Sequence, residues 1–380
     1  KDITRRGDHS YAYIWKGRTL RGDEKEVIAK RKLDGLKIPL ERDVQARTVS
    51  TLLECVHLIH NALPEIDFNE IDTSTTFLNH RFGAPILIDA MTGGTPEAAK
   101  VNANLAAAAE KLNLGMVLGS QRAALLGEDL AETYKVARRE GPNIFLAANI
   151  GGAQLAKGLS LDDIKKLIDI VKADALVVHL NPLQELIQPE GEPTYKGVLA
   201  KIRELTKQLN LPVIVKEVGC GLSREVALKL ELANVAALNV AGAGGTSWAG
   251  IEYHRAVESE AAQKAELGEI FWDWGIPTAV ALIEVVKAVK IPVIASGGIR
   301  TGLDVAKCLA LGAALSGMAY PLLKAAVISK EEVENTLNKI ILQLKATMFL
   351  VGAQRVSELR NVRRVITQPL KDWLAERERP

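Results

Sequence analysis

Cysteine is scarce in this chain of 380 residues, and long apolar runs are missing. Cys55, Cys220 and Cys308 are widely spaced, with no pair at the separation of a redox or zinc motif, which argues against a disulfide framework. No stretch approaches the roughly 18 apolar residues of a membrane span. The first residues are polar, unlike a secretory signal. These absences predict a cytoplasmic protein.

An excess of one charge sign is also lacking. The 48 basic and 46 acidic residues leave a formal charge of only +2. Because no basic tract alternates with aromatic residues, neither a nucleic-acid groove nor a membrane surface is indicated. Apolar residues make up 48% of the chain, enough for a large core. We therefore expect a globular protein whose partner is a small molecule.

Short apolar runs alternate with helical patterns from residue 83 onward, and each run ends in glycine or polar residues. This alternation is typical of βα units. The runs cover residues 85–90, 114–118, 144–148, 175–178, 212–215, 236–240, 292–295 and 314–317. Eight successive parallel units favour an α/β fold of the (β/α)8 TIM-barrel type over an open doubly wound sheet, which usually has fewer strands.

Two further parts flank the expected barrel of residues 83–329. Residues 1–82 form an N-terminal extension, in which we expect an amphipathic helix near 51–61 and a strand-like passage near 67–77. This extension is expected to cover the barrel's bottom or to reach a neighbouring active site. Residues 330–380 are expected to form C-terminal helices, since 330–352 is apolar at helical spacing.

A dense group of polar side chains follows the fourth run. His179, Asn181, Gln184 and Glu185 lie within seven residues, directly after the apolar stretch 175–178. Ligands bind at the carboxyl ends of the strands in barrels and in open α/β sheets. These four residues are therefore candidate site residues.

A phosphate-binding signal follows the last two runs. Ser296-Gly297-Gly298-Ile299-Arg300-Thr301-Gly302 opens a helical segment, and Gly317-Met318-Ala319 follows the eighth run. Glycines let backbone N–H groups approach an anion, and a helix N-terminus adds positive partial charge. The loops after strands seven and eight are the usual phosphate position of such barrels.

Two more loops indicate a flat cofactor. The glycine-rich segment 241–246 allows close backbone approach, and Lys216 places a cation in the barrel mouth, near a ring atom that becomes anionic on reduction. The alternative for Lys216 is an ion pair with Glu217 or another carboxylate at the mouth. No dinucleotide fingerprint precedes the first helix, which disfavours an NAD fold.

Together these motifs resemble those of type 2 isopentenyl-diphosphate isomerases, which are FMN-dependent TIM-barrel enzymes. The resemblance extends from about Arg31 to the C-terminal helices. It rests on Met91-Thr92-Gly93-Gly94, Gly119-Ser120-Gln121-Arg122, His179-Leu180-Asn181-Pro182-Leu183-Gln184-Glu185, Gln188-Pro189-Glu190-Gly191-Glu192-Pro193, Val215-Lys216-Glu217, Gly244-Gly245-Thr246-Ser247-Trp248 and Ser296–Gly302. The His-Leu-Asn-Pro-x-Gln-Glu element is specific to that family, whereas other FMN barrels share the glycine loops.

The resemblance implies that the enzyme interconverts isopentenyl and dimethylallyl diphosphate in isoprenoid biosynthesis. Reduced FMN would act as the acid/base, and NADPH would serve only to reduce it. By similarity, the flavin would contact Met91, Thr92, Ser120, Asn149, Lys216 and Thr246, with its phosphate on Gly297, Gly298, Arg300, Gly317 and Ala319.

The same resemblance assigns the substrate. The diphosphate and alkene would contact Arg31, Lys32, Ser120, Arg122, His179, Asn181 and Gln184, and Glu185 would bind a Mg²⁺ that bridges diphosphate oxygens. Gln184, His179 and Lys216 would serve catalysis. Gln184 is a poor proton donor by itself, so a positioning or relay role is expected for it.

One position departs from the family's pattern. Arg31-Lys32-Leu33-Asp34-Gly35 matches the family's Arg-Lys-x-x-His clamp except that Gly35 replaces the histidine. Arg5-Arg6-Gly7-Asp8-His9 repeats the spacing upstream, so His9 either supplies the missing donor or belongs to a solvated basic arm. A lost charge-assisted hydrogen bond would cost about 1.5–3 kcal/mol of binding.

Two alternatives stay open at the level of sequence. An FMN-dependent hydroxy-acid oxidoreductase would share the glycine loops and the lysine, but it needs a histidine base near a carboxylate-binding arginine after strand six or seven. The first histidine after the sixth run is His254. The other alternative is a non-catalytic flavin- or diphosphate-binding homologue, favoured only by Gly35. We expect a homotetramer or a larger homo-oligomer.

Overall fold

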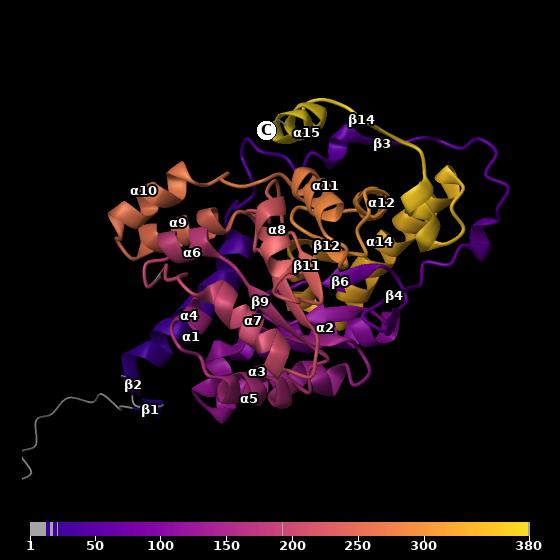
Figure 1. Ribbon diagram of the computed structural model, residues 1–380. Coiled ribbons are helices and arrows are strands. Elements are labelled where there is room, and N and C mark those ends of the chain that lie inside the picture. Colours follow the sequence, from indigo (N-terminus) through magenta and orange to yellow (C-terminus); the bar gives the residue numbers. More distant parts are fainter. Residues whose placement is uncertain (1–12, 16–17, 21, 192, 379–380) are drawn as a thin grey trace, which may run out of the picture.

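Eight short parallel strands form a closed barrel at the centre of the molecule (Figure 1). The computed structural model describes residues 13–15, 18–20, 22–191 and 193–378. The barrel strands are β6 (Ile86–Ile88), β7 (Gly115–Val117), β8 (Leu146–Gly151), β9 (Ala175–His179), β10 (Val213–Lys216), β11 (Ala237–Asn239), β12 (Val293–Ala295) and β13 (Leu315–Met318). The last strand pairs with the first, which closes the ring. The predicted (β/α)8 barrel is confirmed, and each expected run overlaps one strand.

An outer layer of helices covers the barrel. A helix of this layer follows each strand: α2 (Pro96–Leu112), α3 (Glu128–Glu140), α5 (Leu161–Val171), α7 (Val198–Gln208), α8 (Arg224–Glu231), α11 (Thr278–Ala288), α12 (Gly302–Ala310) and α13 (Tyr320–Ile328). Extra helices lie in the loops at the strands' carboxyl ends: α4 (Gly152–Ala156), α6 (Pro182–Ile187), α9 (Trp248–Glu258) and α10 (Ala262–Ile270).

Local sequence explains where several helices begin. The side chain of Thr95 accepts a hydrogen bond from the Ala98 amide, and Pro96 follows as the first residue of α2. Ser160 and Asp163 form a reciprocal capping box at the start of α5. Such caps satisfy amides that have no partner within the helix. The strand-to-helix boundaries are therefore encoded locally.

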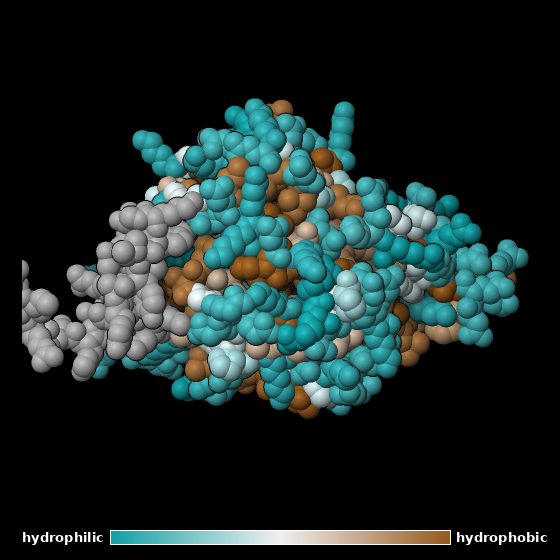
Figure 2. All heavy atoms as spheres, turned by 90° about the horizontal axis from the view of Figure 1, so that it is seen from below, coloured by the Kyte–Doolittle hydropathy of each residue, from teal (hydrophilic) through white to brown (hydrophobic). Residues whose placement is uncertain are grey.

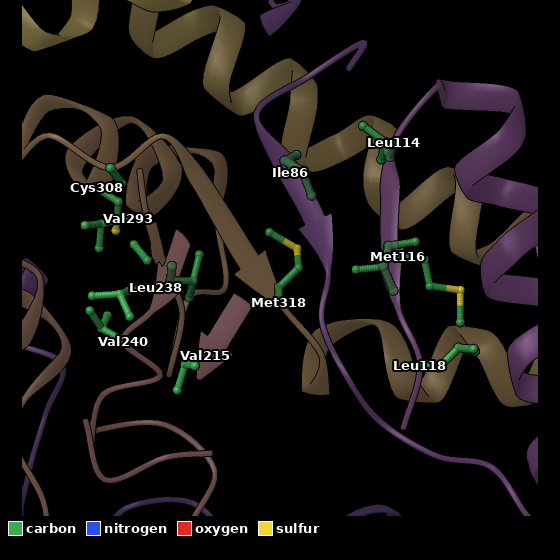
Figure 3. Packing of buried hydrophobic residues seen from close by; sticks show 14 of the residues in the cluster. Ile86, Leu114, Met116, Leu118, Val215, Leu238, Val240, Val293, Cys308 and Met318 are labelled. Atoms are coloured by element: carbon green, nitrogen blue, oxygen red, sulfur yellow. The ribbon is translucent and has the colours of Figure 1, made fainter. Parts of the chain in front are cut away.

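The strand pleat divides the core into two clusters. One cluster includes Leu87, Val177, Ile214 and Leu315, at alternate strand positions that point into the barrel. The other cluster lies between strands and helices, and Figure 3 shows Ile86 of β6 among its side chains. Inward and outward positions are thus both apolar, as expected for strands covered by helices on one face and filled on the other.

The chain before the barrel contains a long helix and two short strand pairs. They are β1 (Tyr13–Trp15) with β2 (Arg18–Leu20), α1 (Gly22–Glu41), β3 (Val56–Leu58), and β4 (Thr75–Phe77) with β5 (His80–Phe82). Phe77 and Phe82 join the inner cluster of the barrel and pack edge-on against each other. The β4–β5 hairpin therefore closes the barrel end opposite the strands' carboxyl ends, while α1 runs toward α6 and α9 (Figure 1).

The helix predicted near residues 51–61 is wrong. Residues Leu53–Cys55 form a 3-10 turn, and β3 then pairs antiparallel with β14 (Arg364–Ile366), about 300 positions later. This distant pairing decides the local conformation. The strand-like passage near 67–77 holds a 3-10 turn (Phe68–Glu70) and β4.

The C-terminal segment is mostly helical, as expected. The predicted helix near 330–352 is α14 (Lys330–Val351), and α15 (Leu370–Glu378) ends the described chain. Between them lie a 3-10 turn (Val356–Asn361) and β14, which the sequence pattern did not indicate. Hydrophilic residues dominate the face seen from below, with apolar residues showing between them (Figure 2). Among the described helices, none is long and apolar enough to cross a membrane.

Candidate active site

A cavity opens where the carboxyl ends of the barrel strands meet. Its empty volume is about 1610 Å³ with its opening to solvent included. Every site residue expected from the sequence lines it: Arg31, Lys32, Met91, Thr92, Ser120, Arg122, Asn149, His179, Asn181, Gln184, Glu185, Lys216, Thr246, Gly297, Gly298, Arg300, Gly317 and Ala319. The cavity has room for a flat cofactor and a second small ligand.

The strand pleat explains why polar side chains converge there. Asn149, His179 and Lys216 each stand two residues after an inward-pointing apolar residue of the same strand. Side chains two residues apart point to the same face of a strand. The inner layer therefore changes from apolar to polar in one step toward the carboxyl ends, and the cavity lies on the polar layer.

Two glycine-containing loops, residues 296–298 after β12 and 317–319 at the end of β13, form one wall of the cavity. We call this wall the glycine wall. Gly297 and Gly298 both have positive φ, and a Cβ on Gly297 would lie 2.1 Å from the Gly242 carbonyl oxygen. Glycine is therefore required at 297 for close packing against Gly242, and both Gly297 and Gly298 line the cavity.

The helices after these loops differ at their N-termini. In α12, the Arg300 and Thr301 amides donate to Asp304 Oδ2, and the Gly302 amide donates to Gln343 Oε1. In α13, the N-cap residue Ala319 makes no capping bond through its side chain. A phosphate would therefore find its backbone donors at Gly297, Gly298 and the start of α13, rather than in the first turn of α12.

A buried polar group at the base of the cavity has no partner. Thr92 is 3% exposed, and its Oγ1 makes no hydrogen bond among the described residues. An unsatisfied buried hydroxyl costs free energy unless a ligand completes it. This orphaned donor and the glycine wall fit a flat, phosphate-bearing cofactor.

Lys216 is a buried cation beside the same site. Its ammonium group donates to the Glu217 carbonyl oxygen at 2.8 Å and lies 3.6 Å from Asp89 Oδ2. Asp89 in turn accepts from Asn239 Nδ2. The carboxylate of Glu217 turns away and accepts three backbone amides, while its burial raises its pKa to about 7. The ion-pair partner of Lys216 is therefore Asp89 rather than Glu217.

A corner with three cations, Arg31, Lys32 and Arg122, lies where α1 covers the mouth. Lys32 Nζ donates to the Ser120 carbonyl oxygen at 2.8 Å, which also accepts from the buried Tyr134 hydroxyl. Desolvation and the nearby charges of Arg31 and Arg122 lower the pKa of Lys32 to about 7. When three cations lie close together, each disfavours the charged form of the others. Such a cluster is typical of a site that binds a multivalent anion.

His179 is held in one tautomer. Asn149 Nδ2 donates to the Leu118 carbonyl oxygen, so its Oδ1 faces His179 Nδ1 at 2.8 Å as an acceptor. The proton must then lie on Nδ1, which leaves a lone pair on Nε2. Burial, together with Lys216 and Lys32, lowers the pKa of His179 to about 3. His179 is therefore a neutral acceptor before any ligand binds.

Gln184 lies in a chain of hydrogen bonds. Its Oε1 accepts from Asn181 Nδ2, and its Nε2 donates to Glu252 Oε1, each at 3.0 Å. Tyr195 holds Asn181, because its hydroxyl donates to Asn181 Oδ1 and accepts from the Asn181 amide. These hydrogen-bond partners therefore fix the orientation of the Gln184 side-chain amide, with Oε1 toward Asn181 and Nε2 toward Glu252.

Glu185 is the expected metal ligand, and it is buried at the wall of the cavity. Among the described residues, no group of three or more His, Cys, Asp or Glu side chains gathers for a metal ion. A site with one protein carboxylate fits Mg²⁺, which keeps several waters and takes further oxygens from phosphates.

The departure at Gly35 leaves open space. A Cβ there would meet only Trp248 Cη2, at 4.0 Å, and the residue lies on the cavity wall. Glycine is therefore not required sterically in α1. His9 lies outside the described residues.

Sequence reasoning overlooked several residues of the site. Asp89, Trp248 and Arg255 also line the cavity. Asp89 follows its inward-pointing neighbour Leu87 by two residues, so the same pleat rule would have found it. Arg255 lies in α9, three residues after Glu252, but its other partners, Asp34 and Glu190, come from distant segments that no local pattern indicates.

The fold and this mouth site define an FMN-type (β/α)8 barrel. A family model described as "FMN-dependent dehydrogenase" matches residues 172–365. Solved structures with the same fold include a mandelate oxidase variant with benzaldehyde (TM-score 0.63, 19% identity, 90% of this chain and 98% of that chain). A putative lactate oxidase of Pediococcus acidilactici is similarly related (TM-score 0.63, 15% identity, 91% and 94%).

Curated relatives identify the family to which this chain belongs within the class of FMN-type barrels. The isopentenyl-diphosphate delta-isomerase of Methanosarcina barkeri is 45% identical over 351 residues, covering 92% of this chain and 95% of the relative. Those of Thermococcus onnurineus (45%, covering 93% and 96%) and Pyrococcus furiosus (44%, covering 93% and 91%) are equally similar. The chain belongs to the isopentenyl-diphosphate delta-isomerase family.

Proposed function

We propose that this protein interconverts isopentenyl diphosphate and dimethylallyl diphosphate, with FMN and Mg²⁺ bound in the cavity at the barrel mouth. The observation that carries the proposal is the juxtaposition of a flavin-type glycine wall with the cations of α1 in one cavity. Identity of about 45% to named isomerases over 92% of the chain supports the reaction. A flavin site and a diphosphate site sharing one cavity is the arrangement this chemistry requires.

The flavin is proposed to lie between the glycine wall and β6. Its phosphate would take the backbone donors of Gly297, Gly298 and Ala319, with Arg300 and Gly317 beside it. Its ring would contact Met91, Thr92, Ser120, Asn149, Lys216 and Thr246. Reduced FMN supplies the acid/base chemistry of the isomerisation when bound. The orphaned Thr92 hydroxyl is the strongest local support for this placement.

The diphosphate is proposed to bind at the corner formed by Arg31, Lys32, Ser120 and Arg122. Its negative charge would raise the lowered pKa of Lys32 and hold the ammonium form. Glu185 would bind Mg²⁺ on the other side of the diphosphate oxygens.

His179, Asn181 and Gln184 are proposed to orient the substrate. The neutral Nε2 of His179 can accept one hydrogen bond, and the Gln184 amide is fixed by Asn181 and Glu252. Neither residue is proposed as the acid. Their role is to keep the alkene against the flavin, so that protonation and deprotonation occur at defined carbons.

The test is conversion of isopentenyl diphosphate by purified protein with FMN and Mg²⁺ under anaerobic conditions. One sample is reduced with dithionite, and the other keeps oxidised flavin. Turnover confined to the reduced sample is the expected result, and omission of Mg²⁺ should abolish it. No turnover despite bound, reduced FMN would reject the isomerase and leave the non-catalytic homologue.

The hydroxy-acid oxidoreductase has little local support. It needs a histidine base after strand six or seven, but His254 packs against Tyr253 and Trp272 and is not among the residues that line the cavity. Oxidation of lactate or mandelate by the FMN-loaded protein would favour this reading instead.

Three finer features belong to the same proposal. NADPH is proposed as the physiological reductant, a homotetramer or larger homo-oligomer as the assembly, and the cytoplasm as the location. NADPH-dependent bleaching of the bound flavin would test the first, and light scattering of the full chain the second.

A further inference from the structure

One buried arginine joins three elements around the cavity. Arg255 of α9 is 8% exposed, and its guanidinium contacts three carboxylates. Nη1 lies 2.6 Å from Glu252 Oε2, Nη2 lies 2.8 Å from Glu190 Oε1, and Nε lies 3.3 Å from Asp34 Oδ2. Burial opposes its charge, but Glu252 and Glu190 hold the pKa of Arg255 above its ordinary value.

The first of these contacts leads to Gln184. Glu252 is 1% exposed, and its two oxygens are divided between Arg255 and the Gln184 side chain. A buried carboxylate without a cation would take up a proton, and burial already raises the pKa of Glu252. Arg255 therefore keeps Glu252 ionised as an acceptor, and Glu252 holds Gln184 Nε2 in place.

The other two contacts lead to α1. Asp34 stands on the same helix as Arg31 and Lys32, two positions after the latter. Glu190 lies 2.8 Å from Arg255 and 4.0 Å from Arg31. The helix that carries the diphosphate cations is thus bound to the same guanidinium that holds Gln184 through Glu252.

We propose that Arg255 is a positioning residue that couples the cation-bearing helix α1 to the orientation of Gln184. Diphosphate binding on α1 and placement of the alkene beside Gln184 then depend on one buried ion cluster. The inference rests on the proposed isomerase function, and it adds a residue that acts through Glu252 and Asp34. Lysine cannot replace this arginine, because a point-like ammonium group cannot reach three carboxylates in a planar fork.

Two variants of the full-length, FMN-loaded protein separate the two arms of the cluster. Arg255→Lys loosens both arms, so kcat should fall about 10- to 100-fold, the loss expected for a misplacement near 1 Å, and KM should rise. Asp34→Asn loosens only the contact to α1, so KM should rise severalfold while kcat is nearly kept. Flavin affinity and the flavin absorbance spectrum should stay unchanged in both.

A double-mutant cycle tests the link to Gln184. Once Gln184→Ala removes the positioned amide, adding Arg255→Lys should lower kcat little further, because both changes remove one effect. The matched control is Arg138→Lys, since Arg138 pairs with Asp174 at the amino ends of the strands. That variant should keep wild-type kcat and KM.

Binding of inorganic diphosphate, measured by calorimetry, decides the inference without turnover. Weaker binding by Asp34→Asn and Arg255→Lys, but not by Arg138→Lys, is expected. Unchanged kcat, KM and diphosphate affinity in a folded Arg255→Lys variant would overturn the proposal, as would fully additive losses with Gln184→Ala. If Arg255→Lys fails to fold, Asp34→Asn alone carries the binding test. An inactive wild-type protein would reject the isomerase function, whereas the binding data would still judge the coupling.

Discussion

At the scale of single residues, the site is defined by groups whose charge is set by their neighbours. Lys32 has a pKa near 7 because its ammonium group is desolvated beside two arginines. His179 is neutral, because burial and nearby cations lower its pKa to about 3. The corner formed by Arg31, Lys32 and Arg122 therefore carries less positive charge at neutral pH than these residue types suggest.

Affinity for inorganic diphosphate should fall as pH rises above 7. The anion binds the ammonium form of Lys32, so binding above the free pKa requires proton uptake. Below pH 7 the ammonium form is already present, and the affinity contributed by Lys32 is complete. Above it, the apparent Kd should rise by up to about tenfold per pH unit until the pKa of the complex is reached.

Calorimetry from pH 6 to 9 measures this dependence, with Lys32→Arg as the control. Arginine keeps its charge throughout this range, and the ligand's own titration is common to both proteins. The difference between the two curves therefore reports Lys32. Parallel curves would show that Lys32 is fully protonated in the free protein.

At the scale of elements, helix starts decide which backbone donors face the cavity. At the start of α12, Thr301 and Asp304 form a capping box that satisfies backbone amides, whereas α13 begins without a side-chain cap. The α12 cap also fixes the point where the loop containing Gly297 and Gly298 enters the helix. The cap of α12 is therefore expected to affect cofactor binding at the loop proposed to hold the phosphate.

Thr301→Ala should lower both stability and flavin affinity. The Thr301 hydroxyl accepts from the Asp304 amide at 3.1 Å, and loss of such a cap costs about 1 kcal/mol. Ser160→Ala removes the corresponding capping box of α5. Urea denaturation should give similar losses for both variants, but a flavin fluorescence titration should show weaker FMN binding only for Thr301→Ala. Equal flavin affinities would mean that the glycine loop is held without the cap.

At the scale of the whole molecule, the proposed flavin site joins both ends of the barrel sequence. Thr92 follows the first barrel strand, and Gly297, Gly298 and Ala319 follow the last two. Because β13 pairs with β6, these segments become neighbours only when the ring closes. A ligand bound there stabilises the closed barrel and has no affinity for its separate parts.

Adding FMN should therefore raise the midpoint of thermal unfolding. At a free FMN concentration of 100 times Kd, linkage contributes about 2.7 kcal/mol, which corresponds to several degrees. Differential scanning fluorimetry measures the shift, with riboflavin as the control because it lacks the phosphate. A smaller shift is expected with riboflavin at the same concentration. Equal shifts with FMN and riboflavin would show that the phosphate adds nothing to binding, so the glycine loops would not be a phosphate site.

The sequence by itself determined the barrel and eighteen of the residues that line the cavity. Each strand is a short apolar run bounded by glycine or polar residues, and this pattern is local. Where a run ends in a polar residue such as Asn149, His179 or Lys216, the period of two places it on the inner face. Closure of parallel strands then brings their ends together, so neighbours in space followed from positions in the repeat.

Only the tertiary structure decided the contacts between distant segments. The pairing of β3 with β14 replaced an expected helix, and Asp34, Glu190 and Glu252 met at Arg255. The tautomer of His179 likewise follows from Asn149, thirty residues away. Local periodicity carries no information on such pairs, because their free energy comes from burial and hydrogen bonds that exist only after the barrel has packed.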